Sequence, residues 1–239
     1  MKRVRLLELG RAPYRRVLAF QRELHWRVAR GETEDTWIVV EHDAVITLGR
    51  KAKRENVLLP PRVLAARGVD VVEVERGGDA TYHGPGQLVV YPIVKLQRFR
   101  EVVPFVSALE AAVIAALGSF GIAAHGRPEH RGVYVGRNAI AAVGLAVKQM
   151  TTLHGLALNV TTALDYDRLI TPCGTPQFGI TSVAQEVGPW VGLDSARDAL
   201  LSALETQFAF TFDRGKASVE TGAAKVDLET AASGPKSAS

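Results

Sequence analysis

The sequence predicts an α+β fold, in which a β-sheet is packed with helices within a single domain. Short β-branched and apolar runs follow one another in groups, and separate amphipathic segments interrupt these groups. The pattern lacks the regular alternation of strand and helix that is typical of a parallel α/β sheet, so we expect the helices to cover one side of the sheet. With 239 residues, 47% of them hydrophobic, the chain can bury a core of useful size.

Three segments are predicted to be helices. Residues 12–30 place apolar side chains on one helical face and are followed by a glycine. Residues 104–120 are rich in alanine, and Pro104 suits the first turn of a helix. Residues 195–208 form the last amphipathic segment, in which Ser195 is the predicted N-cap.

Six segments are predicted to be β-strands, because they are rich in β-branched and apolar residues and are bounded by turn-forming residues. They are residues 36–41, 71–75, 87–94, 132–135, 139–148 and 155–160. The third contains Pro92, which lacks a backbone N–H. This proline predicts either an edge strand or a bulge.

Composition and local patterns limit the domain organisation and the cellular location that we expect. Residues 1–214 are expected to form one domain, and residues 215–239, rich in small and polar residues, to form a flexible tail. No run of roughly 18 or more apolar residues indicates a membrane-spanning helix, and the N-terminus has no signal-peptide pattern. A single cysteine excludes an intrachain disulfide and a zinc site built on several thiolates. We therefore expect a cytoplasmic protein.

The chain is mildly basic, with a net charge of +4 at pH 7. Its densest cluster of cations, the basic patch, consists of Arg50, Lys51, Lys53 and Arg54. Such a cluster is either a solvated loop or a docking site for an acidic partner, protein or nucleic acid. Nucleic acid is the weaker alternative, because no aromatic residues interleave with these cations.

Three segments look too specialised to be scaffold. Residues 76–87 (RGGDATYHGPGQ) contain four glycines and a proline, which indicates a sharply bent backbone that a ligand can approach closely. The lysine that completes a P-loop is absent there. Residues 151–160 (TTLHGLALNV) bring a His-Gly pair into an apolar strand that could wall a ligand channel. Residues 171–182 (TPCGTPQFGITS) contain the cysteine.

Cys173 lies between a proline and a glycine in a predicted loop. A buried structural cysteine needs no such setting, whereas a nucleophile must present its sulfur to the substrate with little steric cover. The thiolate is the reactive form, so a neighbouring base or cation should lower the pKa of this thiol. His83 and His154 are the candidates that the sequence offers, and each has a plainer alternative as a solvated or structurally satisfied histidine.

Four motifs, taken in order and spacing, resemble those of the octanoyltransferases of lipoate biosynthesis. They are residues 41–50 (EHDAVITLGR), 76–93 (RGGDATYHGPGQLVVYPI), 141–160 (AAVGLAVKQMTTLHGLALNV) and 171–174 (TPCG). The resemblance extends from about residue 5 to about residue 210. It implies a mixed sheet packed with helices, similar to the catalytic domain of biotin protein ligases and lipoate ligases.

This family transfers an octanoyl or lipoyl group from the phosphopantetheine thioester of acyl carrier protein to a lysine amine of a lipoyl domain. The resemblance implies that Cys173 forms the acyl-thioester intermediate, with ping-pong kinetics. The implied partners are octanoyl-acyl carrier protein, the lipoyl domains of 2-oxoacid dehydrogenase complexes and the glycine cleavage H protein. No cofactor, metal, nucleic acid or membrane is expected. The basic patch would suit such acidic proteins, mainly through electrostatic steering.

The same motifs imply the substrate-binding residues. The glycine-rich loop would wrap the acyl and thioester end of the substrate, and two strand segments would line the acyl channel. Backbone amides of the glycine-rich loops could hold a tetrahedral oxyanion. The implied residues are Arg76, Gly77, Gly78, Asp79, Ala80, Thr81, Tyr82 and His83 in the loop, and Ala142, Val143, Gly144, His154, Gly155, Leu156 and Ala157 in the strands.

Ala139 departs from the family pattern. The family has a lysine there, in a pattern like GRK-(I/V)-AA-(I/V)-G, and that lysine is held to lower the pKa of the nucleophilic cysteine. Lys148 follows nine residues later, and strict alternation along one strand would put it on the opposite face. Three explanations stay open: natural loss, replacement by another cation such as Lys148 or Arg76, and an engineered substitution, which the ordinary surroundings favour. We expect weaker thiolate formation and slower chemistry, with binding largely retained.

Three other functions stay open. An ATP-dependent lipoate or biotin ligase on the same fold would activate a free acid as an acyl-adenylate and would need no nucleophilic cysteine, so the TPCG motif argues against it. A non-catalytic acyl or carrier-protein binding module becomes more credible without the lysine. A nucleic-acid-binding role rests on charge alone and would show a steep salt dependence.

Overall fold

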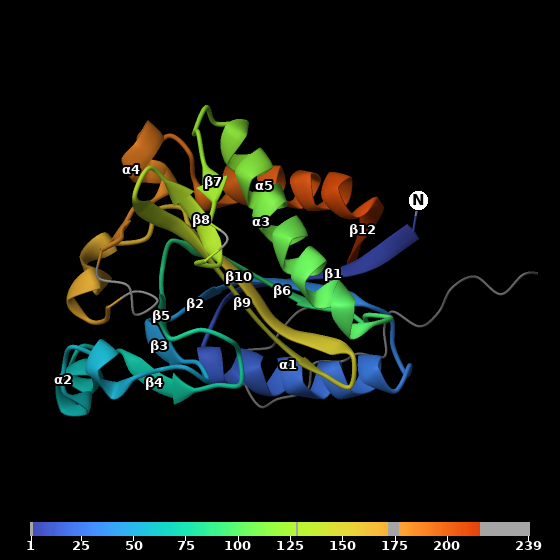
Figure 1. Ribbon diagram of the computed structural model, residues 1–239, viewed down its shortest axis with the longest axis horizontal. Coiled ribbons are helices and arrows are strands. Elements are labelled where there is room, and N and C mark those ends of the chain that lie inside the picture. Colours follow the sequence, from blue (N-terminus) through green and yellow to red (C-terminus); the bar gives the residue numbers. More distant parts are fainter. Residues whose placement is uncertain (1, 128, 172–176, 216–239) are drawn as a thin grey trace, which may run out of the picture.

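A large mixed β-sheet forms the centre of the molecule (Figure 1). The computed structural model describes residues 2–127, 129–171 and 177–215. Within these residues the large sheet has nine strands in the order β12-β1-β2-β6-β10-β9-β8-β7, and β11 pairs with β9. Their bounds are β1 Lys2–Ala12, β2 Thr36–His42, β6 Gln87–Ile93, β7 His125–Gly126, β8 Gly132–Val135, β9 Asn138–Lys148, β10 Thr151–Asn159, β11 Gly179–Ile180 and β12 Phe210–Gly215.

A second, three-stranded sheet lies beside the large one and has the order β4-β3-β5. Its strands are β3 Val45–Leu48, β4 Asp70–Glu73 and β5 Ala80–His83, with β3 parallel to β4 and antiparallel to β5. β5 belongs to the glycine-rich segment, which the sequence predicted to be a loop throughout. Pairing with β3 therefore anchors the second half of that segment just before the chain enters β6.

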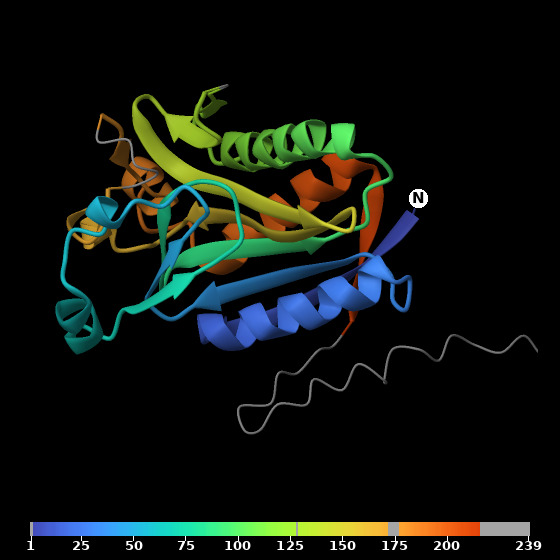
Figure 2. The same cartoon turned by 60° about the horizontal axis from the view of Figure 1, so that its bottom comes forward.

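Helices cover both faces of the large sheet, as Figure 2 shows. α1 (Tyr14–Ala29) packs on one face, and α3 (Val102–Gly118) and α5 (Leu193–Phe208) pack together on the other. Each face has its own cluster of buried apolar side chains. The expectation that helices cover only one side is therefore wrong. A strand that faced solvent on one side would carry polar residues at alternate positions. β6 is instead buried at every position, as expected for a strand covered on both faces.

The predicted helices lie close to the observed ones, but one cap differs. Pro104 lies in the first turn of α3, as predicted. α5 begins at Leu193 with Gly192 as its N-cap, and the Ser195 hydroxyl donates a 2.9 Å hydrogen bond to the Gly192 carbonyl. The prediction of Ser195 as the N-cap is therefore wrong, because its side chain bonds backward within the first turn. Shorter helical segments are α2 Pro61–Ala66, α4 Val183–Val187, η1 Arg54–Asn56, η2 Phe99–Glu101 and η3 Leu164–Arg168.

Pro92 lies in β6, a central strand between β2 and β10, so the edge-strand alternative is wrong. Pairing between β6 and β10 is nevertheless interrupted around this residue. The Thr152 hydroxyl bridges the gap, since it donates to the Pro92 carbonyl at 2.6 Å and accepts from the Val94 N–H at 2.9 Å. His154, with a positive φ of 61°, lies in this irregular stretch of β10.

The segment from η2 through α3 is unusually apolar. Phe99–Gly118 is long and apolar enough to cross a membrane by length and composition alone, although 33% of that window is buried in the protein. Its second half is a core helix, because Leu109, Val113 and Leu117 are fully buried against the sheet and α5. Its first half is partly exposed, with Phe99 and Val103 exposed and Phe105 and Val106 half-buried.

The end of the described chain lies in β12, which pairs in parallel with β1 at one edge of the sheet. Residues 216–239, nearly all of the predicted flexible tail, lie outside the described residues. That part of the prediction stays a prediction.

Candidate active site

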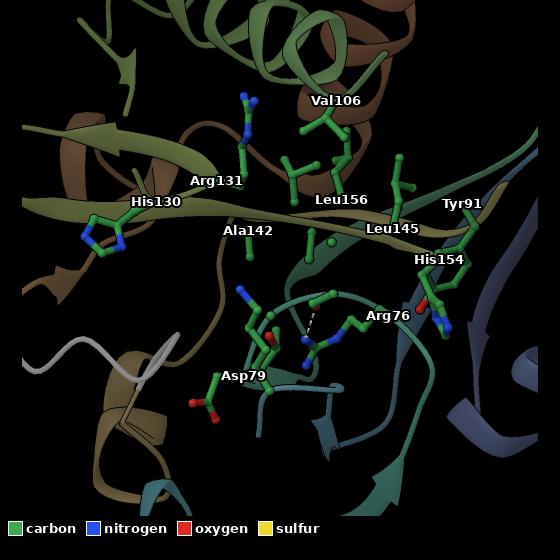
Figure 3. A pocket seen from close by; sticks show the side chains of 18 of the residues that line it. Arg76, Asp79, Tyr91, Val106, His130, Arg131, Ala142, Leu145, His154 and Leu156 are labelled. Atoms are coloured by element: carbon green, nitrogen blue, oxygen red, sulfur yellow. Dashed lines mark hydrogen bonds between the residues drawn. The ribbon is translucent and has the colours of Figure 1, made fainter. Parts of the chain in front are cut away.

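A cavity of about 440 Å³ lies between the start of α3 and the glycine-rich loop that follows β4 (Figure 3). Its volume is in the range of small-molecule binding sites. Thirteen of the fifteen predicted substrate-binding residues line it: Arg76, Gly77, Gly78, Asp79, Thr81, His83, Ala142, Val143, Gly144, His154, Gly155, Leu156 and Ala157. The remaining two, Ala80 and Tyr82, line a smaller neighbouring cavity. That these residues bind substrate stays a prediction.

The cavity has a buried end and an open end. Tyr91 and His154 lie at the buried end, whereas His130 and Arg131 lie toward the surface (Figure 3). Ten lining residues were not assigned to the site from the sequence: Tyr14, Lys51, Tyr91, Val102, Val103, Val106, Glu129, His130, Arg131 and Leu145. Of these, Lys51 belongs to the basic patch, and Tyr91 and Leu145 lie within motifs noted in the sequence, although neither was assigned to the site. The valines join the site because α3 packs over β9 and β10, which no local pattern reveals.

Arg76 is a buried cation in the cavity wall. Its Nη2 donates to the carbonyl and the hydroxyl of Thr47 at 2.7 and 2.9 Å, and its Nη1 donates to the Gly77 carbonyl at 2.9 Å. A Cβ on Gly144 would lie only 3.3 Å from the Arg76 Cδ. Glycine at position 144 therefore lets the arginine lie flat across β9, where its charge faces the cavity.

Asp79 lines the cavity, but its carboxylate ties loops together. Oδ1 accepts from the Ala80 N–H at 2.6 Å and the Lys53 N–H at 3.3 Å, and Oδ2 accepts from Asn56 Nδ2 at 2.7 Å. The Asn56 carbonyl in turn accepts the Thr171 N–H at 2.9 Å. The carboxylate thus connects the glycine-rich loop to η1, and the Asn56 carbonyl connects η1 to Thr171, the last described residue before 172–176.

The protonation of His83 follows from its hydrogen bonds. Its Nδ1 lies 2.7 Å from Gln87 Oε1, while Gln87 Nε2 donates to Asn159 Oδ1 at 2.9 Å. The glutamine oxygen can only accept, so the His83 proton is on Nδ1 and Nε2 keeps its lone pair. Burial, and secondarily the nearby His42, lowers the pKa of His83 to about 3. His83 is therefore neutral and too weak a base for proton abstraction at neutral pH.

His154 is also buried, and its φ of 61° is rare for a residue with a side chain. Its Nε2 lies 3.5 Å from Glu75 Oε2, and Arg22 Nη2 donates to the same oxygen at 2.9 Å. Contact with His154 and hydrogen bonds from Arg22 hold the pKa of Glu75 well below its usual range. Burial outweighs the carboxylate and lowers the pKa of His154. Neither candidate histidine therefore supplies a cation at neutral pH.

Ala139 lines the second cavity, of about 30 Å³, together with Ile170 and Ile180. These two isoleucines come shortly before and shortly after residues 172–176. Cys173 itself lies outside the described residues, so its role stays a prediction. Ala139, where the resemblance implies a lysine, therefore lies close to residues on both sides of the cysteine-bearing segment.

Lys148 lies at the other end of β9, with its Nζ 3.7 Å from Glu75 Oε1. The register between β8 and β9 shifts between Ala141 and Ala139, so strict alternation does not hold along β9 and cannot place Lys148 relative to Ala139. The length of the strand separates the two residues instead, because the nine residues of extended strand from Ala139 to Lys148 span about 30 Å. Lys148 is therefore too remote to replace a lysine at position 139.

All four side chains of the basic patch are exposed. Lys51 lies at the cavity, while Arg50, Lys53 and Arg54 border a groove along β4 and α2. In the described part of the chain, no group of three or more His, Cys, Asp or Glu side chains is placed to hold a metal ion.

The fold and this cavity define a catalytic domain of the lipoate-ligase type. Residues 13–205 match the family described as Lipoyl protein ligase A/B catalytic domain. The structure is similar to lipoate-protein ligase A bound with ATP, with a TM-score of 0.77 and 20% identity over 90% of this chain and 89% of that one. It is also similar to a bi-partite lipoate protein ligase of Thermoplasma acidophilum, with a TM-score of 0.71 and 18% identity over 90% and 87% of the chains. The predicted fold class is confirmed.

Relatives identified by sequence indicate which family of this class the chain belongs to. The chain is 44% identical over 189 residues to an octanoyltransferase of Syntrophobacter fumaroxidans, covering 79% of this chain and 83% of that one. It is 41% identical over 207 residues to an octanoyltransferase of Alkaliphilus metalliredigens, covering 86% and 95%. The chain belongs to the octanoyltransferase family, and the protein is an acyltransferase that handles octanoyl or lipoyl groups.

Proposed function

We propose that the protein moves an octanoyl or lipoyl group from acyl carrier protein to a lysine of a lipoyl domain, through a thioester on Cys173. The acceptors are the lipoyl domains of 2-oxoacid dehydrogenase complexes and the glycine cleavage H protein, and the step begins protein lipoylation. The observation that carries this proposal is the gathering of thirteen motif residues, from the glycine-rich segment and from the β9–β10 hairpin, around one cavity. The Thermoplasma acidophilum relative, described together with an E2 lipoyl domain, supports a lipoyl-domain acceptor.

The chemistry consists of two balanced exchanges. The Cys173 thiolate attacks the carbonyl carbon of the donor thioester, and the phosphopantetheine sulfur leaves and takes a proton. The lysine amine then attacks the acyl-cysteine, the Cys173 thiolate leaves, and the amine loses its proton to solvent or a base. The first exchange converts one thioester into another, and the second forms the more stable amide.

The described residues support distinct roles in this proposal. Val106 and Leu156 give the cavity apolar walls on the α3 side, which suit an acyl chain (Figure 3). Arg76 adds a fixed positive charge that favours a thiolate or an oxyanion over the neutral species. Because Ala139 replaces the family lysine and Lys148 is remote, Arg76 is the remaining candidate cation of those that the sequence offered. Slower formation of the acyl-cysteine is the expected consequence.

The test is incubation of the protein with octanoyl-acyl carrier protein, followed by its intact mass, with Cys173→Ser as the control. The expected result is one octanoyl adduct on the parent chain alone, which disappears when a lipoyl domain is added and an octanoyl-lysine forms. Absence of an adduct from both the parent and Ala139→Lys would leave the non-catalytic binding module as the better function. ATP-dependent modification by Cys173→Ser would instead favour a ligase.

The proposal also covers the domain organisation, the cellular location and the partners of this enzyme. Residues 1–214 would act as one catalytic domain with a tail at 215–239, in the cytoplasm. Neither nucleic acid nor a membrane would take part. Both carriers would be acidic proteins, which the basic patch suits as a source of electrostatic steering.

A further inference from the structure

An apolar stripe runs from the surface of the protein into the cavity along the start of α3. It consists of Phe99, Val102, Val103 and Val106, which we call the α3 stripe. Their spacing of three and four residues places them along one side of the continuous η2–α3 helix. Its inner end, Val106, lies above Leu156 in the cavity (Figure 3).

The outer end of the α3 stripe is strongly exposed. The side chains of Phe99 and Val103 are 73% and 60% exposed, and Phe99 is the most exposed large apolar residue of the described chain. Val102, Val103 and Val106 also line the cavity. The apolar wall of the site therefore continues onto the surface without a break, which is typical of a surface that a partner covers.

Cations flank the stripe. Arg98 and Arg100 are exposed on either side of Phe99, and neither forms an ion pair within the described residues. Arg131 lies at the cavity mouth, where it pairs with the buried Glu110 at 3.0 Å. The nearby acids are Glu101, whose carboxylate accepts the Gln97 N–H, and Glu129 at the mouth. The two unpaired arginines leave this surface ready for an acidic partner.

We propose that the α3 stripe, with Arg98 and Arg100, is the docking surface for the acyl carrier protein. The inference rests on the proposed function, since it takes the donor to be an acidic protein that carries its acyl group on a thioester arm. Such a partner would cover Phe99 and Val103, pair its acidic side chains with the two arginines, and lead the acyl chain along Val102 and Val106 into the cavity. A membrane surface would also match exposed apolar and basic side chains. Membrane binding would not explain, however, why the α3 stripe continues into the cavity.

The test measures binding separately from chemistry. Its probe is acyl carrier protein whose octanoyl group is attached through an amide in place of the thioester, titrated calorimetrically into the full chain at low salt. For the double variant Arg98→Glu/Arg100→Glu we expect the Kd to rise at least about tenfold, and for Phe99→Ser by about fivefold or more. Arg16→Glu/Arg27→Glu on α1, which covers the other face of the sheet, is the matched charge control, and Trp26→Ser, 44% exposed, is the apolar control. Both controls should bind like the parent.

A second readout separates docking from the acyl site. In the variants, kcat/KM with octanoyl-acyl carrier protein should fall as binding weakens, whereas kcat/KM with octanoyl-pantetheine, which has no protein to dock, should stay at the parent value. Equal losses with both donors would overturn the docking proposal and assign the stripe to the acyl site or to the fold. Carrier binding that is unchanged in all variants would also overturn it.

The remaining outcomes are equally distinct. Carrier binding that depends on Phe99 and the arginines, without any transfer, would support the docking surface and refute the proposed function. No binding of the carrier by the parent would refute both. Parent binding to vesicles of phosphatidylcholine and phosphatidylglycerol that Phe99→Ser abolishes, with carrier binding intact, would assign the stripe to a membrane instead.

Discussion

Ile180 pairs with Ala139 in a short parallel ladder, and the next residue, Thr181, donates its N–H to the Ala139 carbonyl at 2.9 Å. Ile170, which precedes residues 172–176 in the sequence, lines the same small cavity as Ala139 and Ile180. The backbone on both sides of the cysteine-bearing segment is therefore held close to Ala139, where the resemblance implies a lysine. A side chain at position 139 is well placed to influence that segment.

The first prediction is that Ala139→Lys increases activity. A cation within about 4–6 Å lowers the pKa of a thiol by roughly 1–3 units, and each unit corresponds to up to tenfold more thiolate below that pKa. We expect the pH profile of Cys173 alkylation by iodoacetamide to shift down by about one unit or more, and acyl transfer to rise about tenfold. Ala139→Met, which adds similar bulk without charge, is the control. An unchanged alkylation profile in Ala139→Lys would refute the idea.

The second prediction concerns the carboxylate that ties the loops. Asp79→Ala removes three hydrogen bonds and leaves Asn56 Nδ2 without its acceptor, so we expect a loss of about 1–3 kcal/mol in the free energy of unfolding. Hydrogen exchange should rise locally at the amides of Lys53 and Ala80. The control Asp43→Ala removes a largely exposed pair with Arg11 and should cost less than about 1 kcal/mol. Equal effects of both variants on stability and exchange would show that Asp79 has no special role.

The third prediction compares two glycines in the cavity wall. A Cβ on Gly155 would lie 2.0 Å from the Val90 carbonyl oxygen, a backbone atom that cannot move aside, so Gly155→Ala should be destabilised by about 3 kcal/mol or more. A Cβ on Gly144 would meet the Arg76 Cδ and the Gly77 carbonyl oxygen, each at 3.3 Å, so a shift of only a few tenths of an ångström would accommodate it. Gly144→Ala should therefore stay folded and lose mainly activity. Thermal unfolding and octanoyl transfer measure the two effects, and the reverse order would contradict the packing described here.

The fourth prediction concerns pH and stability. Burial lowers the folded-state pKa of His42 to about 4 and that of His83 to about 3, from an ordinary value of 6.5. The unfolded chain thus binds more protons below pH 6.5, so the free energy of unfolding should fall as the pH drops from 6.5 toward 4.5. Each histidine contributes at most about 1.4 kcal/mol per pH unit. Urea unfolding at several pH values should show a shallower slope for His42→Gln, and an unchanged slope would show that His42 does not titrate in this way.

Local patterns were sufficient for much of the fold. The segment that became α1 has one apolar helical face and could be located from spacing, and the stretch that became α3 could be located from its alanine content and a proline suited to its first turn. β1 was missed, since its exposed arginines and buried leucines do not alternate strictly. β5 was missed as well, because four residues among glycines have no strand signal until β3 pairs with them.

The motifs of the sequence determined which residues gather at the site, and the tertiary structure decided how the site is built. Glycine-rich and His-Gly motifs are local, so Arg76 and Gly155 could be assigned to a ligand site from the sequence and its resemblance to a family. The valines of α3, Tyr14 and Tyr91 line the same cavity only because both faces of the sheet are covered by helices. The burial that keeps His83 neutral, and the bond from Gln87 to Asn159 that orients its partner, also depend on contacts between segments distant along the chain. Such contacts arise from packing over the whole chain, and no short stretch of sequence contains them.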